Sequence, residues 1–247
     1  QRSELSGSRI HKLRQRARRR LTWKRFVRSV LQKFKFSEQL FMLISGLIIG
    51  VAGGYVSVGF KWLIRQVQKI AWGGWEDPLL LVSDFQWYWL IIIPATGGLL
   101  TGLIIRFMSS EAKGHGVPEV MEATALRNGV IRWRVPVAKA FASAISIGTG
   151  GSVGREGPMV QIGAAVGSIW GQFTEVTSRK MKTFVGCGAA AGIAATFNAP
   201  IAGALFALEI ILGDFGLAHF SPIVVSSVIS TVISHRYINE FQTFEVP

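Results

Sequence analysis

The amino-acid sequence predicts an all-α protein that crosses a membrane several times. Its 247 residues are 49% hydrophobic and include 28 glycines. Long apolar runs are followed by short apolar segments that break at glycine and proline. Soluble domains of this length seldom combine these features, whereas glycine is common where transmembrane helices pack closely. We therefore expect one polytopic helical membrane domain.

The net charge of +13 is concentrated at the N-terminus. Residues 1–36 contain 13 Lys/Arg and one acid, whereas residues 37–247 contain 14 Lys/Arg and 13 acids. This distribution predicts a basic cytoplasmic or interfacial segment over 1–36, attracted to anionic membrane lipid, and a transmembrane domain over 37–247. Apolar residues interleaved through 10–36 indicate an amphipathic helix in the interface. Because the remaining chain offers no basic groove, nucleic acid is excluded as a partner.

Two long apolar segments come first. Residues 38 to 68 exceed the roughly 20 residues that a bilayer requires, so this span is expected to tilt and to emerge with Lys61 and Arg65. An interfacial loop is expected next, marked by Trp72, Trp75, Asp77 and Pro78. A second span is predicted over 87–108, with an aromatic belt at Trp87–Trp89.

The later segments are shorter and broken. Helices are predicted at 114–126, at 135–147, from the glycine-rich stretch to near Phe173, and at 183–197, 201–212 and 221–237. Half-length helices of this kind are typical of a transport pathway, because irregular backbone at membrane depth persists only where it lines a cavity. Small residues recurring every four positions predict close helix contacts, at Gly163, Gly167 and Gly171 and at Gly188 and Gly192.

The stretch from Gly148 to Gly171 carries the most specific chemistry. A glycine-rich turn there enters a helix through Pro158, which leaves backbone N–H groups unpaired at the positive end of a helix dipole. Such an end suits an anion, and the carboxylate of Glu156 could itself occupy or vacate it. Similar turns occur at Gly114–Pro118 and Phe197–Pro200. The three turns could converge and bind a halide through dipoles rather than through a full cation.

These motifs resemble the signatures of CLC chloride channels and chloride/proton exchangers. The matching residues are Gly114-His115-Gly116-Val117-Pro118-Glu119, then Gly154-Arg155-Glu156-Gly157-Pro158 with Val160-Gln161-Ile162-Gly163, then Phe197-Asn198-Ala199-Pro200. Their order and spacing also match, and the resemblance covers residues 38–240. It implies a CLC-type fold of broken and tilted helices, the first of two inverted repeats. It also implies an anion site at Gly114, His115, Gly116, Val117, Pro118, Gly154, Arg155, Gly157 and Pro158.

Three charged residues take roles from this resemblance. Glu156 matches the gating glutamate, which blocks the anion path when ionised; the alternative is a structural carboxylate at a helix N-terminus. Arg155 is expected to orient the loop, with a share in drawing anions inward. Lys139 matches a lysine beneath the pathway that contributes positive potential, and a surface lysine is the alternative.

Two departures from the family pattern bear on function. His115 stands where the family commonly has serine, and its imidazole could either donate an N–H to the anion or point away. Ile210 stands where proton-coupled members often carry an internal glutamate, and Glu209 matches the preceding structural acid. The sequence therefore favours a passive chloride channel. A chloride/proton exchanger is the alternative, and a non-conducting membrane scaffold or regulatory subunit is a further one.

The resemblance also implies partners and a location. A homodimer is expected through 201–212 and 221–237, in the cell membrane with a cytoplasmic N-terminus. The family's second inverted half should begin where this sequence ends, at Pro247, so a complete pore is not expected from these residues alone. No cofactor is expected besides the transported chloride. Neither a metal site nor an enzyme is expected, because the serines lack a partnered base and the histidines lack metal spacing, at His11, His115, His219 and His235.

Overall fold

The computed structural model describes residues 38–74, 86–108 and 113–237. The chain divides into two units, Gln1–Phe41 and Met42–Pro247, and the arrangement below is that of the second. The amphipathic helix predicted over 10–36 lies outside the described residues, as do Trp75, Asp77 and Pro78.

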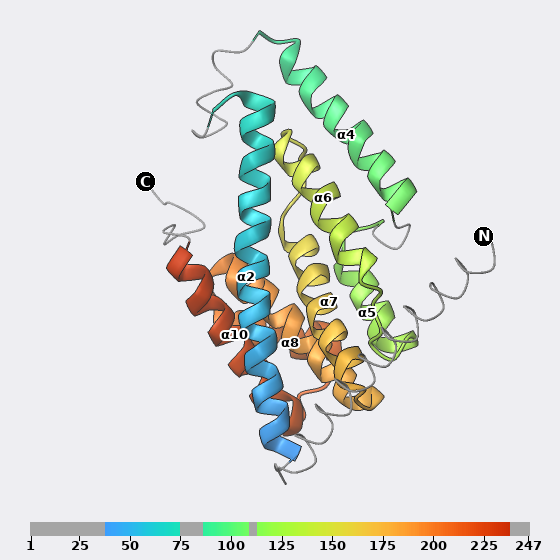
Figure 1. Cartoon of the computed structure of the whole chain (residues 1–247), viewed down its shortest axis with the longest axis vertical. Coiled ribbons are helices and arrows are strands. Elements are labelled where there is room, and N and C mark those ends of the chain that lie inside the picture. The colour runs from blue at the N-terminus through green and yellow to red at the C-terminus, as the bar shows by residue number, and fades with distance from the viewer. Residues whose placement is uncertain (1–37, 75–85, 109–112, 238–247) are drawn as a thin grey trace, which may run out of the picture. The chain divides into compact units, whose positions relative to one another are not determined.

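The described part of the chain is helical and contains no β-strand. Figure 1 shows the elements in order. They are α2 (Glu38–Trp72), α4 (Trp89–Met108), α5 (Val117–Leu126), α6 (Arg134–Gly148), α7 (Glu156–Thr174), α8 (Ser178–Phe197), α9 (Pro200–Phe206), the π-helix η2 (Ala207–Leu212) and α10 (Leu217–Tyr237). Each helix predicted from residue 38 onward corresponds to one of these elements, and 201–212 corresponds to α9 and η2 together. The all-α prediction is therefore confirmed.

Proline and residues in the left-handed conformation set several helix boundaries. Pro118 and Pro200 lie in the first turns of α5 and α9, where a missing N–H costs no intrahelical hydrogen bond. α8 ends at Asn198, whose φ of 55° is left-handed and stops the helix. α8 and α9 are thus separate helices because Asn198-Ala199-Pro200 ends one and begins the next.

Within the described ranges, two helices are long and apolar enough to cross a membrane. α2 has 35 residues and α4 has 20, with mean hydropathies of 2.0 and 1.9 over their most apolar windows. Within α4 the single buried residue is Gly97, which lies against the side chain of Thr149, the residue that follows α6. The other residues of α4 present a largely apolar surface, as expected for a helix that faces lipid.

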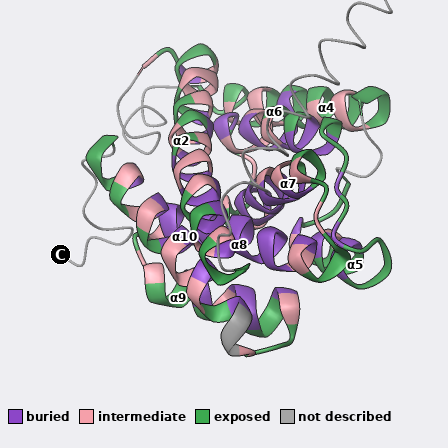
Figure 2. Cartoon of the chain, turned by 60° about the horizontal axis from the view of Figure 1, so that its bottom comes forward, coloured by how far each residue is buried: buried purple, intermediate pink, exposed green. Residues whose placement is uncertain are grey.

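α7 and α8 cross at the centre of this unit through glycines. A Cβ on Gly163 would collide with the carbonyl oxygen of Gly188, and a Cβ on Gly188 would collide with that of Gly163. Gly167 and Gly192 meet backbone carbonyls of the opposite helix in the same way. α8 is buried from Thr183 to Thr196, and Figure 2 shows it largely in the colour of buried residues. The predicted small-residue faces therefore pack against each other.

α10 is attached to α8 by a ladder of serine hydroxyls. Three serines, four residues apart, donate to three carbonyls with the same spacing: Ser226 to Cys187 at 2.9 Å, Ser230 to Ala191 at 3.0 Å and Ser234 to Ala195 at 2.8 Å. α2 approaches α10 closely as well, since Gly46 and Gly50 lie against the backbone of Pro222 and Ser226. Interhelical hydrogen bonds and small residues are the usual means of helix association in membranes.

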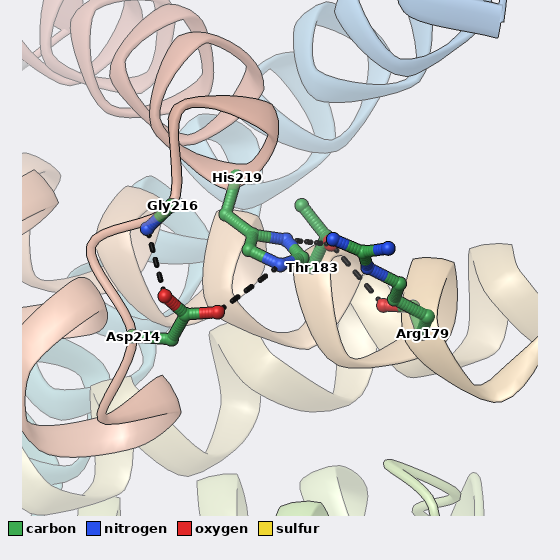
Figure 3. A network of polar contacts seen from close by, with 5 residues as sticks. All are labelled: Arg179, Thr183, Asp214, Gly216 and His219. Atoms are coloured by element: carbon green, nitrogen blue, oxygen red, sulfur yellow. Dashed lines mark hydrogen bonds and ion pairs between the residues drawn. The ribbon is translucent and has the colours of Figure 1, made fainter.

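A polar network joins the first turns of α8 and α10 (Figure 3). The hydroxyl of Thr183 lies 2.6 Å from Nδ1 of His219 and donates to the carbonyl of Arg179 at 3.2 Å. Nε2 of His219 lies 3.6 Å from the carboxylate of Asp214, which also accepts from the N–H of Gly216 at 2.8 Å. The described residues include no group of three or more His, Cys, Asp or Glu that could hold a metal. The hydrogen bond between Thr183 and His219 connects α8 to α10.

The prediction that Trp72 belongs to an interfacial loop is wrong. Trp72 is the last residue of α2 and is 6% exposed, and its Nε1 donates to the carbonyl of Gly148 at 3.1 Å. The reason is that α2 continues past the predicted end near residue 68. Its final turns pack on the end of α6, where Val67 lies against Gly148.

Candidate functional site

The first turn of the candidate site leads into α5. Gly114 and Gly116 have φ values of 103° and 108°, a region that glycine adopts without strain. Glu119, in the first turn of α5, reaches back so that its Oε2 accepts from the N–H of Gly116 at 2.6 Å. The same carboxylate lies against Gly114. The N-terminus of α5 is therefore occupied by a carboxylate from its own helix.

The second turn connects α6 to α7. Gly150 has φ 90°, and the N–H of Gly151 donates to the carbonyl of Ser146 at 2.8 Å, which turns the chain back after α6. α7 begins at Glu156, two residues before Pro158. The side chain of Glu156 is exposed, and its carboxylate lies against the backbone of Gly154. Glu156 thus stands in the first turn of a helix, at the positive end of the dipole.

The two turns pack against each other through their backbones. A Cβ on Gly157 would collide with the carbonyl of His115, and a Cβ on Gly116 would collide with the carbonyl of Gly157. Only glycine permits this approach at both positions. The N-terminal ends of α5 and α7 are consequently neighbours, so the N–H groups that helix starts leave without intrahelical partners lie close together.

A cavity of about 380 Å³ lies where these turns meet α4 and α6. Of the predicted site residues, those that line it are Gly114, His115, Val117, Lys139, Gly154, Glu156, Gly157 and Pro158. Gly116 is buried against Gly157, and neither Pro118 nor Arg155 is among the lining residues. None of the described lining residues comes from Phe197–Pro200, so the third predicted turn does not join the first two at this cavity.

Lys139 is held beside the first turn. It is 4% exposed, and its Nζ donates to the carbonyl of Gly114 at 2.6 Å. The alternative of a surface lysine is therefore wrong. Lys139 also interacts electrostatically with Glu119, so the two charges that flank the first turn have opposite signs.

Three hydroxyl-bearing residues at the cavity were not predicted: Thr101, Ser143 and Ser146. A signal for two of them was present, since Lys139, Ala142, Ser143 and Ser146 have the i, i+3, i+4, i+7 spacing of one helix face. Thr101 on α4 carried no such signal; its hydroxyl donates to the carbonyl of Ala142 at 3.1 Å.

A second cavity, of about 320 Å³, adjoins α5. The residues that line it include Lys113, Glu119, Glu122, Arg127 and Gln161. Glu122 and Arg127 form an ion pair with a 2.9 Å separation. Glu119 therefore touches the first turn and also faces this second cavity.

Together, these features define an all-helical membrane fold in which two helices, α5 and α7, begin at a shared cavity. Residues 97–247, more than half of the chain, match the family model described as voltage gated chloride channel. The chain belongs to this CLC family of integral membrane proteins, and the resemblance found in its motifs is confirmed.

Relatives from bacteria and plants match most of the chain. A ClcB-like protein of Ralstonia nicotianae is 34% identical over 210 residues, which is 83% of this chain and 49% of the relative. The chloride channel protein CLC-f of Arabidopsis thaliana is 30% identical over 83% of this chain and 27% of its own length. The chain thus spans about half, or less, of the curated relatives it matches.

Solved structures show the same fold. The structure of a CLC-type fluoride/proton antiporter covers 86% of this chain with a TM-score of 0.70 and 22% identity, over 51% of its own chain. The structure of a slow cyanobacterial Cl⁻/H⁺ antiporter covers 86% of this chain with a TM-score of 0.68 and 21% identity, also over 51%. At these identities the likeness concerns the fold, and the predicted CLC-type fold class is confirmed.

Proposed function

We propose that this chain supplies half of a pathway that carries chloride or a similar small anion across the membrane, with Glu156 as its gate. The observation that carries the proposal is the shared cavity, where the starts of two helices meet beside a buried cation. His115, Lys139 and Glu156 line this cavity together. The expected second half of the transport domain, the homodimer and the cell-membrane location with a cytoplasmic N-terminus belong to the same proposal.

The electrostatics of the cavity suit an anion that must also leave. Helix N-termini attract negative charge through partial charges, which hold an anion less tightly than an exposed ammonium group would. The charge of Lys139 is already engaged with the carbonyl of Gly114. Glu156 places a carboxylate at the start of α7, so a bound anion and this carboxylate compete for the same positive end.

Passive conduction is favoured over proton exchange. Among the described residues that line the cavity, Glu156 carries the single carboxylate. A proton route through a membrane protein requires a chain of titratable groups, and the position of the family's internal glutamate is here the apolar Ile210. Chloride/proton exchange remains the alternative, and a non-conducting scaffold the further one.

Replacing Glu156 tests the gate. In liposomes that contain the full-length protein, Glu156→Gln is expected to raise chloride efflux, because a neutral side chain no longer competes with the anion at the start of α7. The expected increase is on the order of tenfold, which corresponds to lowering the barrier to chloride passage by about 1.4 kcal/mol. Glu122→Gln is the matched control, since Glu122 lies outside the first cavity and pairs with Arg127. Chloride efflux is measured with a chloride electrode.

Two outcomes would decide against the preferred mechanism. A reversal potential that follows an imposed pH gradient would show exchange rather than passive conduction. If neither the wild type nor Glu156→Gln released chloride, the scaffold would be favoured.

A further inference from the structure

We propose that Glu119 is a second gate of this pathway, acting at the first turn. The proposal rests on the anion pathway described above and adds a residue to it. The carboxylate of Glu119 accepts from the N–H of Gly116 at 2.6 Å and lies against Gly114. It therefore occupies the donor that the N-terminus of α5 would otherwise offer to an anion.

An anion and the Glu119 carboxylate exclude each other at this turn. The N–H of Gly116 has one hydrogen to donate, and two negative charges a few ångströms apart repel strongly where the dielectric constant is low. An anion that reaches the first turn must therefore displace Glu119. Glu156 also places a carboxylate in the first turn of its helix, α7, whose start packs directly on this turn through Gly116 and Gly157.

The second cavity gives Glu119 a place to go. Glu119 lines this cavity, whereas Gly114, His115 and Val117 of its own turn line the first one. The second cavity has a volume of about 320 Å³ and is also lined by the cationic side chain of Lys113. A Glu119 side chain that rotates away from Gly116 has this cavity to enter, and the cavity lining holds the cations Lys113 and Arg127 as well as the acid Glu122.

Glu119 also sets the charge of the site when no anion is bound. Lys139 is buried, holds the carbonyl of Gly114 at 2.6 Å and interacts electrostatically with Glu119. With Glu119 at the turn, its negative charge opposes the positive charge of Lys139. Neutralising Glu119 would leave that positive charge to attract an anion, so anion affinity should rise.

A purely structural role predicts a different result. A glutamate three residues after the N-cap that accepts from the N-cap N–H is ordinary helix capping. Glutamine has the same shape and retains an acceptor oxygen, so Glu119→Gln keeps the cap and removes the charge. A capping residue would then leave anion affinity unchanged, whereas a gate would not.

The test is chloride binding to the full-length protein, measured by isothermal titration calorimetry, with chloride efflux from liposomes as a second readout. Glu119→Gln is expected to bind chloride on the order of tenfold more tightly than the wild type, which corresponds to about 1.4 kcal/mol. Glu175→Gln is the matched control, since it removes an exposed acid at the C-terminal end of α7 that lines neither cavity. Its affinity is expected to stay within about twofold of the wild type.

Each outcome bears on the proposal. Unchanged or weaker chloride binding by Glu119→Gln would overturn it and leave a helix cap. If that variant does not fold, Glu119→Ala removes the same charge and should also bind chloride more tightly. A wild type that binds chloride and responds to Glu156→Gln, with no response to either Glu119 variant, would overturn the second gate alone. Absence of chloride binding in every form would overturn both proposals.

Discussion

At the scale of single residues, the candidate site depends on one close approach between backbones. Gly116 meets the carbonyl of Gly157, and its φ of 108° is a conformation that other residues adopt only with strain. Gly116, together with Gly157, therefore allows the two helix starts to lie close together. Two effects, backbone strain and collision, act on any side chain placed there.

Replacing Gly116 by alanine should cost more stability than strain alone explains. We expect Gly116→Ala to lower the free energy of unfolding by roughly 2–5 kcal/mol, as strain and overpacking add. Gly213→Ala is the control, because Gly213 also has a positive φ, of 63°, but has no atom within 4 Å of an added Cβ. It should cost only about 1–2 kcal/mol. Thermal unfolding in detergent measures both, and equal losses would show that the contact with Gly157 is unimportant.

At the scale of elements, the crossing of α7 and α8 positions the site. α7 carries Glu156 at its first residue, and its glycines lie directly on the backbone of α8. The serine ladder then joins α8 to α10. A change that separates α7 from α8 should therefore move the start of α7 as well.

Gly188→Ala tests this crossing. The added methyl would meet the backbone of Gly163, which cannot move aside as a flexible side chain can. We expect a loss of about 1–3 kcal/mol in unfolding free energy. Gly59→Ala, in the middle of α2 with no atom within 4 Å of an added Cβ, should be neutral or should stabilise by up to about 1 kcal/mol. If Gly188→Ala unfolded at the same temperature as Gly59→Ala, that result would contradict the close crossing of α7 and α8.

At the scale of the whole molecule, the sequence predicted the order of the helices because their boundaries are set locally. Pro118, Pro200 and Asn198 set helix ends through their own backbone preferences, so the chain positions of α5, α8 and α9 could be read directly. The glycine faces of α7 and α8 were predictable for the same reason, since a four-residue repeat describes one face of a helix.

Features that depend on contacts between distant segments were not predictable. A tryptophan after an apolar run looks the same whether it faces lipid headgroups or, like Trp72, donates to the carbonyl of Gly148. The hydrogen bond from the N–H of Gly116 to the Glu119 carboxylate was not predicted, because the motif gave no reason to place that carboxylate at the first turn. Convergence of three turns was inferred from their likeness, and only the packing of the turns shows that two of them meet at the cavity.

The expected homodimer would form through the segments 201–212 and 221–237, which include α9 and α10. Both helices expose apolar side chains, with Ile201 at 74% and Val232 at 61% exposure. Bulky residues placed in a close helix interface separate the partners, because association in membranes depends on close packing. We expect Ile201→Trp combined with Val232→Trp to convert a dimer of the full-length protein into monomers, measured by light scattering after size-exclusion chromatography in detergent. Ile91→Trp on α4, where Ile91 is 61% exposed, should leave the dimer intact. Dissociation by Ile91→Trp alone would place the interface on α4 instead.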